Sequence, residues 1–447
     1  MTIRVYILAF LMISPGRGIS QTIPEMVDEL LKAYSMQRSF NGVALVGSKG
    51  ALLLQKGYGL QNVKTGTLNT PNTIFQTGSL TKQFTAAIIL QLQDEKKLAI
   101  QDPLSKYIPG YPEGDKITLE MLLAHTAGIF SYTNDESFMR RAAERPITLD
   151  SLIAYIKSRP LDFQPGTSFS YSNSGYVLLG AVIEKVTGRS YFRAVRERIL
   201  VPLGMDHSGF DFHALKSAGK AIGYRKLSAT VNEPATVVDS SLSYAAGGLY
   251  STAADLYKWD RSLYGHRILS DTSLKQAFTP HRSKYGYGWF VDTTFGSIVM
   301  MHGGTISGFS CFMAHIPASE TCIILLDNTG APDLPRIGEN IDAILNDRPY
   351  DFPEPRQEIV PDTAVLSQYV GEYRFSAEFS ITITLENGEL MAAAPGQGKN
   401  EMFAEKDNLF FMKGVDTRIE FVKGATGRLE KMIFRQEGVE TTGIKVR

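Results

Sequence analysis

Over residues 21–346, apolar positions form two groups of strand-like runs that enclose a long helical stretch. A helical pattern over 24–36 and strands over 42–47 and 51–57 open this region. Strands over 298–302, 309–316 and 321–328 and a helix over 334–345 close it. Short loops between successive strands require antiparallel pairing. We therefore predict an α+β fold: one antiparallel sheet flanked by the two terminal helices, a mainly helical lobe over 79–278, and a cleft between them.

Prolines mark the end of this region. Pro349, Pro353, Pro355 and Pro361 lie among charged residues without a regular period, which predicts a linker over 347–361. Short alternating strands separated by turn residues follow, and they predict a small antiparallel barrel or sandwich over 362–447. The expected strands are 369–375, 379–385, 389–394, 409–411, 418–422 and 429–435.

The first 20 residues have the layout of a secretory signal peptide. Arg4 precedes an apolar run over 5–13, and Gly18, Ile19 and Ser20 form a small-x-small site. The run is too short to span a bilayer, which needs about 20 apolar residues. A buried first strand or helix is the alternative. We predict export to the periplasm or the medium, with cleavage after Ser20. The mature chain then consists of the α+β region over 21–346, the linker over 347–361 and the small β domain over 362–447, and it has no transmembrane segment.

Composition narrows the classes of function. The 447 residues are 43% hydrophobic and 21% charged, with 46 basic and 46 acidic side chains and a formal net charge of zero. This balance argues against disorder and against nucleic acid as a partner. If the turn after 309–316 closes a hairpin, Cys311 faces residue 326 and not Cys322. We expect two free, inert thiols, no metal and no cofactor; the oligomeric state stays open.

The first candidate for chemistry is Ser79 with Lys82. Both residues lie at the start of a segment whose apolar residues have helical spacing. The i, i+3 spacing places them on one face of that predicted helix. A lysine desolvated in a cleft can be neutral and can take a serine's proton, while the helix N-terminus offers an N–H to an oxyanion. The spacing recurs at Ser217 and Lys220, and an isolated match is usually a helix cap beside a solvated lysine.

The second candidate is Tyr171 with Asn173, directly before a helical run. A tyrosine flanked by cations can lose its proton near neutral pH and act as a base, and an asparagine can both donate and accept hydrogen bonds. Tyr132 and Asn134 repeat this spacing, so the pattern alone does not choose between them. A tyrosine packed at a helix start is the structural alternative for either one.

The third candidate is the segment from His302 through Gly304 to Thr305, at the end of an apolar strand. Glycines at a strand edge allow a substrate backbone to approach, and an N–H there can be a second oxyanion donor. Lys64, with Thr65 and Gly66 after it, is a competing lysine triplet that we place in a surface turn.

These three motifs, in this order and on these elements, resemble those of the serine β-lactamase and penicillin-binding protein superfamily. The closest likeness is to its class C branch, with the related D-aminopeptidases, DD-carboxypeptidases and esterases. The stretches 122–129, 164–188 and 246–255 also resemble that family, and the likeness covers about 24–346. It favours Ser79 over Ser217 and Tyr171 over Tyr132, and it implies a β-lactamase/transpeptidase-like fold. The tail resembles the lipocalin-like barrel domains that follow some of these hydrolases.

The resemblance implies a role for each motif residue. Ser79 is acylated, Lys82 and Tyr171 shuttle its proton, and Asn173 holds Lys82 and the substrate amide. The backbone N–H groups of Ser79 and Thr305 form the oxyanion hole, and water releases the acyl group without metal or cofactor.

His302 departs from the family pattern, since many members carry lysine there. A histidine of ordinary pKa is mostly neutral at pH 7, whereas lysine offers a fixed charge to a substrate carboxylate. We therefore expect a serine hydrolase of esters or small (D-amino) peptides and amides, with slow or absent β-lactam turnover. The alternatives are a β-lactamase or DD-carboxypeptidase proper and, from another class, a penicillin-binding or sensing protein without turnover.

Two further features have structural alternatives. His125 can face the cleft, but a hydrogen bond to loop backbone is the favoured role. Tyr285, Tyr287, Trp289 and Phe290 can wall the acyl pocket, although their period of two also fits a half-buried strand, which we favour.

Overall fold

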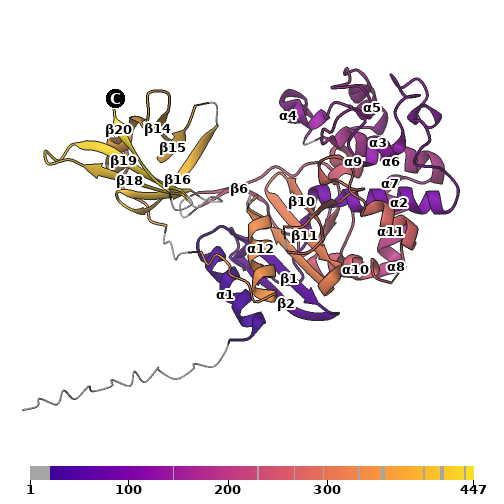
Figure 1. Cartoon of the computed structure of the whole chain (residues 1–447), viewed down its shortest axis with the longest axis horizontal. Helices are drawn as coiled ribbons and strands as arrows, with labels where there is room; N and C mark the ends of the chain where they lie inside the picture. The colour runs from indigo at the N-terminus through magenta and orange to yellow at the C-terminus, as the bar shows by residue number, and fades with distance from the viewer. Residues whose placement is uncertain are drawn as a thin grey trace, which may run out of the picture.

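The computed structural model describes residues 21–446, apart from 144, 229–230, 266, 295, 331–332, 354–357, 396–397, 413–416 and 437–438. The expected signal peptide, 1–20, lies outside the described residues. A six-stranded antiparallel sheet in the order β2-β1-β12-β11-β10-β9 forms the centre of the N-terminal part (Figure 1). Its strands are β1 Gly42–Ser48, β2 Ala51–Tyr58, β9 Phe290–Asp292, β10 Val299–Ile306, β11 Phe309–Ile316 and β12 Thr321–Asp327.

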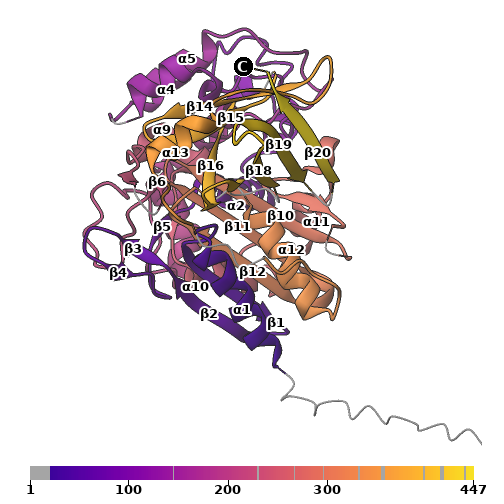
Figure 2. The same cartoon turned by 90° about the vertical axis from the view of Figure 1, so that its left-hand side faces the viewer.

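Two helices from opposite ends of this part cover one face of the sheet (Figure 2). They are α1, Ile23–Met36, and α12, Leu334–Leu345. The α1 helix starts with a capping box, in which the Thr22 N–H donates to the Glu25 carboxylate at 2.8 Å. Both helices bury an apolar stripe against strands whose residues alternate between the two faces, so the two ends of the sequence share one core.

The helical lobe packs on the other face, over the larger core. The predicted fold class is confirmed: an antiparallel sheet with terminal helices, and a helical lobe between its two groups of strands. The lobe contains α2 Thr81–Asp94, α3 Leu119–Leu123, α4 Glu136–Ala142, α5 Leu149–Lys157, α6 Asn173–Thr187, α7 Tyr191–Val195, α8 Val201–Leu203, α9 Ser240–Gly247, α10 Ala253–Ser262 and α11 Asp271–Ala277. Short strands add β3 Leu60–Asn62, β4 Thr67–Leu68, β5 Phe75–Gln76, β6 Tyr224–Leu227, β7 Asn232–Pro234 and β8 Tyr250–Ser251.

The predicted hairpin register of the cysteines is found. Cys311 on β11 faces Leu326, and Cys322 on β12 faces His315. Both thiols are free and buried. Burial raises the pKa of each thiol, so neither is the thiolate that disulfide exchange or metal binding needs.

The C-terminal part is a closed antiparallel barrel with its own core. A short helix, α13 Thr363–Leu366, precedes it, and Tyr373 pairs with Lys445 to close the ring. Alternating strand residues face the interior, as the sequence predicted, but two of the strands, β16 and β20, were not foreseen. The barrel consists of β13 Gly371–Arg374, β14 Ser380–Glu386, β15 Glu389–Ala393, β16 Lys399–Lys406, β17 Leu409–Met412, β18 Thr417–Lys423, β19 Leu429–Gln436 and β20 Val439–Lys445.

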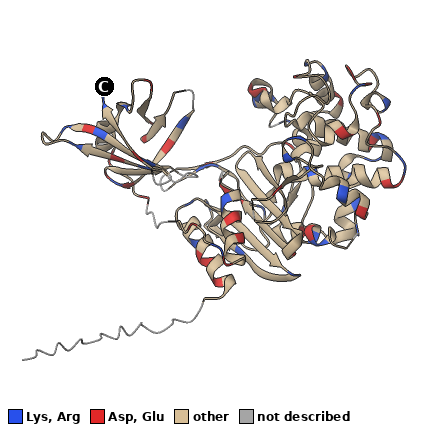
Figure 3. Ribbon diagram, in the orientation of Figure 1, with Lys and Arg blue, Asp and Glu red and all other residues tan. Residues whose placement is uncertain are grey.

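One hairpin of the N-terminal part reaches the barrel. Strand β6 extends towards the barrel (Figure 1). Its Lys226 forms an ion pair with Glu401 at 2.9 Å and a second one with Glu389. Acidic and basic residues are interspersed over both parts (Figure 3), in line with the zero net charge. Among the described residues, no helix has the length and apolar character needed to cross a bilayer.

Candidate active site

Ser79 lies on a short 3₁₀ turn, Gly78–Leu80, that runs directly into α2. Gly78 has φ 51°, in the left-handed region that favours glycine. The first ten residues of α2 are all buried, so packing fixes the helix in the core of the lobe. Lys82 therefore projects beside Ser79 from a rigid turn, as the spacing predicts.

The turn that holds Ser79 lies against strand β10. A Cβ atom on Gly304 would lie 2.1 Å from the Thr77 carbonyl oxygen and 3.0 Å from the Ser79 nitrogen, so only glycine fits. A Cβ on Gly78 would lie 3.0 Å from the Thr305 nitrogen. These close approaches bring the backbone nitrogens of Ser79 and Thr305 into one region, and their N–H groups are candidates for the two donors of an oxyanion hole.

Lys82 is 0% exposed, and its amine lies among three oxygen atoms. Nζ is 3.0 Å from Ser79 Oγ, 2.7 Å from Asn173 Oδ1 and 2.8 Å from the Ala246 carbonyl oxygen. Burial holds the pKa of Lys82 well below its ordinary value. A neutral amine has two N–H donors and one lone pair. Nζ donates to all three oxygen atoms in the structure. In a neutral amine the amide and carbonyl oxygens, which can only accept, would keep the two N–H groups, and the lone pair would face the Ser79 hydroxyl.

A loop of the lobe orients Asn173, the first residue of α6. The Asn173 backbone N–H donates to Ser131 Oγ at 3.1 Å, and its Nδ2 donates to Thr133 Oγ1 at 3.0 Å. Since Nδ2 is engaged there, Oδ1 is the atom that faces Lys82. Sequence reasoning missed Ser131 and Thr133; the only signal was the second Tyr-x-Asn triplet, in which Thr133 lies.

Tyr171 lies against the lysine, with Lys82 Nζ 4.8 Å from the centre of its ring. The phenol oxygen is buried and has no hydrogen-bond partner among the described residues. Burial raises the pKa of Tyr171, and the neighbouring Ser79 hydroxyl offsets this only in part. The expectation that flanking cations deprotonate this phenol is not met, because burial drives the lysine itself towards its neutral form. In the free protein Tyr171 is a proton donor.

His302 is 3% exposed and faces an aromatic cluster rather than the cavity described below. Its Nε2 lies 3.1 Å from the Tyr285 hydroxyl oxygen, and the Phe290 ring centre lies 5.4 Å from its own. Burial, with a smaller effect from Lys82, lowers the pKa of His302 to about 3. The imidazole is therefore neutral at pH 7, as the sequence analysis expected, and supplies no fixed positive charge.

The aromatic segment over 285–290 has neither of its expected roles. Tyr285, Tyr287 and Trp289 are buried, and none of them is among the described residues that line the cavity. They are not a strand either, since β9 begins only at Phe290. Tyr285 forms an antiparallel β-bridge with Phe290, and its hydroxyl group hydrogen-bonds to His302.

His125 takes the structural role that the sequence analysis favoured. Its Nδ1 accepts the Ser172 backbone N–H at 3.1 Å, and its carbonyl oxygen accepts the Ser170 N–H at 3.0 Å. These bonds hold the segment that carries Tyr171 into α6.

Two of the competing motifs lie outside the site, whereas Tyr132 of the third lines the cavity beside Ser79 and its hydroxyl donates to the Leu242 carbonyl oxygen at 2.7 Å. Lys64 is in the exposed turn between β3 and β4, as expected. Lys220 Nζ donates to the His213 carbonyl oxygen and makes no bond to Ser217.

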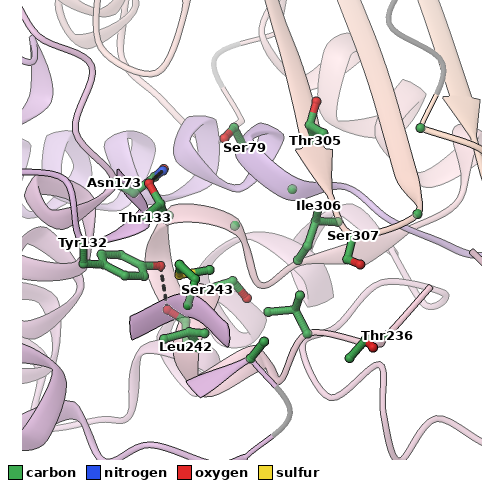
Figure 4. A pocket seen from close by; sticks show the side chains of 18 of the residues that line it. Ser79, Tyr132, Thr133, Asn173, Thr236, Leu242, Ser243, Thr305, Ile306 and Ser307 are labelled. Carbon is green, nitrogen blue, oxygen red and sulfur yellow. Dashed lines mark hydrogen bonds between the residues drawn. The ribbon is translucent and has the colours of Figure 1, made fainter. Parts of the chain in front are cut away.

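Beside Ser79 the structure contains a cavity of about 540 Å³ between the lobe and the end of β10 (Figure 4). Ser79 and Thr305 lie at one end of it, and Asn173 lies at its side. Its walls are mainly apolar, so it suits a substrate group with a hydrophobic body. The lining residues are Gly78, Ser79, Tyr132, Thr133, Met139, Arg140, Ala143, Asn173, Thr236, Val238, Leu242, Ser243, Ala246, Gly247, Thr305, Ile306, Ser307, Gly308 and Gly330.

Known proteins are similar to this chain in sequence and in fold. The family model described as Beta-lactamase matches residues 25–345, and a domain of unknown function, DUF3471, matches 355–444. The chain belongs to the beta-lactamase family. The resemblance seen in the motifs is thereby confirmed for the family as a whole.

Two relatives of the beta-lactamase family come from Bacillus subtilis (strain 168). PbpX, which bears a penicillin-binding-protein name, is 32% identical over 321 residues, covering 71% of this chain and 78% of that protein. Penicillin-binding protein 4* is 27% identical over 444 residues, covering 94% and 98%.

Solved structures of this family extend the comparison. The octameric penicillin-binding protein homologue from Pyrococcus abyssi has a TM-score of 0.67 at 24% identity over 93% of this chain and 99% of that one, which is a likeness of fold. A D-stereospecific amidohydrolase from Streptomyces sp. has a TM-score of 0.61 at 29% identity over 69% of this chain and 97% of that one.

Proposed function

We propose that this protein is an exported serine hydrolase that forms an acyl-enzyme on Ser79 and acts on esters and small amides or peptides, including those of D-amino acids. The observation that carries the proposal is the environment of Lys82. Its buried amine lies within hydrogen-bond distance of Asn173 Oδ1, the Ala246 carbonyl oxygen and Ser79 Oγ, and in its neutral form it has a lone pair to accept the proton of Ser79. A serine is a weak nucleophile until a neighbour removes its proton, and this arrangement supplies that neighbour.

Acylation proceeds in two proton transfers. Ser79 Oγ passes its proton to Lys82 Nζ and forms a bond to the substrate carbonyl carbon, while the carbonyl oxygen becomes an oxyanion between the N–H groups of Ser79 and Thr305. The bond from carbon to the leaving oxygen or nitrogen then breaks, and the leaving group receives the Tyr171 phenol proton. Lys82 returns the serine's proton to Tyr171, so both groups regain their starting states.

Deacylation uses the same groups in reverse. Water adds to the acyl carbon and gives one proton to the Lys82–Tyr171 pair, and the bond from Ser79 Oγ to carbon breaks as that oxygen regains a proton. The products are the free acid and the original serine, with no net gain or loss of protons by the protein.

The neutral His302 supports esters and amides over β-lactams. In a penicillin the carboxylate lies on the carbon attached to the leaving nitrogen, so it approaches the strand that carries His302. With a pKa of about 3, His302 holds no charge there at pH 7. The likeness to a D-stereospecific amidohydrolase at 29% identity supports amides of D-amino acids as candidate substrates.

Intact-protein mass spectrometry of the mature chain tests the proposal. The protein is mixed with p-nitrophenyl acetate, with a D-amino acid amide or with penicillin, and product release is followed in parallel. We expect an acetyl adduct on Ser79, steady turnover of the ester, and slow or no turnover of penicillin. Ser79→Ala is the control, and it should lose the adduct while keeping its melting temperature.

The other outcomes are equally informative. One equivalent of product followed by a stable adduct indicates an acylated sensor without turnover. Rapid turnover of penicillin makes the protein a β-lactamase proper. Absence of any Ser79-dependent adduct with all three compounds overturns the hydrolase proposal.

A further inference from the structure

The proposed mechanism assigns the 540 Å³ cavity beside Ser79 to one side of the reacting carbonyl. In the proposed mechanism the leaving group receives a proton from Tyr171, and Lys82 then returns a proton to Tyr171. Neither of these residues is among the described residues that line the cavity, whereas Ser79, Thr305 and Asn173 are. The leaving group therefore departs away from the cavity, and the part of the substrate that stays on Ser79 extends into it.

Arg140 is the only charged residue among the described residues that line this cavity. It lies in the last turn of α4, and its side chain is exposed at the mouth. It forms no ion pair with any residue that the structure describes, unlike Arg159, which pairs with Asp135 at 2.7 Å. A guanidinium that makes no ion pair within the described part of the chain, at an apolar cavity, is suited to an anionic group of a ligand.

A second polar group faces the same space. Ser243 lines the cavity, its hydroxyl oxygen is buried, and that oxygen has no hydrogen-bond partner among the described residues (Figure 4). A buried polar atom without a partner is costly, so such atoms commonly bond to a ligand or to water. The walls between Ser79 and the mouth include Met139, Val238 and Leu242.

From these observations we infer that the preferred acyl group is an apolar chain that ends in a carboxylate, with the chain along the cavity and the carboxylate on Arg140. This inference rests on the proposed function, because it names the acyl donor of the same site. The inference also distinguishes the two parts of the substrate that can carry a negative charge. An anionic leaving group finds no positive charge at the neutral His302, whereas an anionic acyl group can pair with the Arg140 guanidinium.

Matched esters test the inference. The p-nitrophenyl ester of hexanoic acid and the mono-p-nitrophenyl ester of adipic acid carry acyl chains of equal length, and only the second ends in a carboxylate. Mono-esters of succinic, glutaric and pimelic acid locate the best chain length. We expect the full-length protein to have an about two- to fivefold higher kcat/KM for the best dicarboxylic mono-ester than for its neutral partner, since an exposed ion pair is worth about that much.

The variants assign the preference to one side chain. Arg140→Gln should lower the ratio of the two kcat/KM values to about one, mainly through KM. Arg141→Gln is the matched control, because Arg141 is the neighbouring exposed arginine of α4, bonds to Ser137 and does not line the cavity. It should leave the ratio unchanged. High salt should reduce the ratio in the native protein, as screening weakens an exposed charge pair.

Failure of the inference is distinguishable from failure of the proposed function. Turnover of the hexanoate without preference for any dicarboxylic mono-ester, or an equal loss in both arginine variants, overturns the inference alone. No turnover of any ester overturns the proposed function and the inference with it.

Discussion

The chemistry of single residues at this site follows from burial. Lys82 has no exposed surface, and burial is the cause that lowers its pKa. Tyr171 is buried beside it, and the same desolvation raises the pKa of the phenol. One physical effect therefore shifts the lysine towards its neutral form and holds the proton on the tyrosine more firmly. These two directions favour a base at Lys82 and an acid at Tyr171, the pair that the proposed mechanism uses.

The pH dependence of acylation should report the ionisation of Lys82. Protonated Lys82 cannot accept the proton of Ser79, so kcat/KM for p-nitrophenyl acetate should fall as pH falls through the lowered pKa of Lys82. Lys82→Arg should lose activity by about 10² to 10⁴, the usual range for a positioned base. His302→Asn is the control, since the pKa of His302 is about 3. Loss of the acid limb in that variant contradicts the assignment.

The same histidine should make folding sensitive to acid. His302 has a pKa of about 3 in the folded protein, against an ordinary value of 6.5. Between pH 3 and pH 6.5 the unfolded chain binds more protons at this histidine than the folded protein does. The free energy of unfolding is therefore highest above about pH 6.5 and decreases as the pH falls towards 3. His302→Asn should flatten the fall in unfolding free energy between pH 7 and pH 5, measured by urea denaturation. The exposed His213, replaced by asparagine, should change nothing, and equal slopes in all three proteins count against the idea.

At the scale of elements, the site depends on how closely β10 approaches the turn before α2. Gly304 admits the Thr77 carbonyl where a side chain would stand, and Gly78 admits the backbone of Thr305. The proposed oxyanion hole thus combines two segments that lie far apart in the sequence. They can approach so closely because Gly78 and Gly304 have no side chains.

Two neighbouring glycines of β10 give a direct test of this dependence. A Cβ on Gly304 would lie 2.1 Å from the Thr77 oxygen, whereas one on Gly303 would meet nothing nearer than 3.6 Å. Gly304→Ala should therefore push β10 away from Ser79 and cut kcat by about 10² or more, the cost of a lost oxyanion donor. Gly303→Ala should keep most of the activity. Esterase assays with melting curves for both variants provide the measurement, and equal effects rule out the steric account.

The sequence revealed some of the site residues and strands and not others, and the difference has physical causes. Ser79, Lys82 and Asn173 were found because they lie at helix starts with short local spacings. Thr133, which holds Asn173, was not, because its role depends on contact between segments 40 residues apart in the chain. Strands β16 and β20 were missed because their apolar residues do not alternate: those of β16 are consecutive, Met402 to Ala404, and those of β20 lie near its two ends, at Val439 and Ile444.

At the scale of the whole molecule, three apolar cores account for the architecture. The two cores on either side of the sheet share its strands, while the barrel core draws only on residues from 359 onward. Among the described residues, one contact between the barrel and the N-terminal part is polar: Lys226 on the β6–β7 hairpin pairs with Glu389 and Glu401. The segment after that hairpin contributes Thr236 and Val238 to the cavity wall. The barrel thus touches the hydrolase through the same strand connection that leads to the substrate site.

Removal of residues 362–447 tests whether the barrel is needed for folding. Because its core is separate and its contacts with the hydrolase through Lys226 are partly exposed ion pairs, each worth about 1 kcal/mol or less, the shortened chain should fold and unfold cooperatively. Its kcat/KM for p-nitrophenyl acetate should equal that of the full chain, since this small ester needs little of the cavity. Lys226→Gln in the full chain is the control that breaks the contact without removing the barrel. If the shortened protein is insoluble while Lys226→Gln is stable, the barrel completes the hydrolase core. If both fold but lose activity equally, the hairpin carries the barrel's influence to the cavity wall.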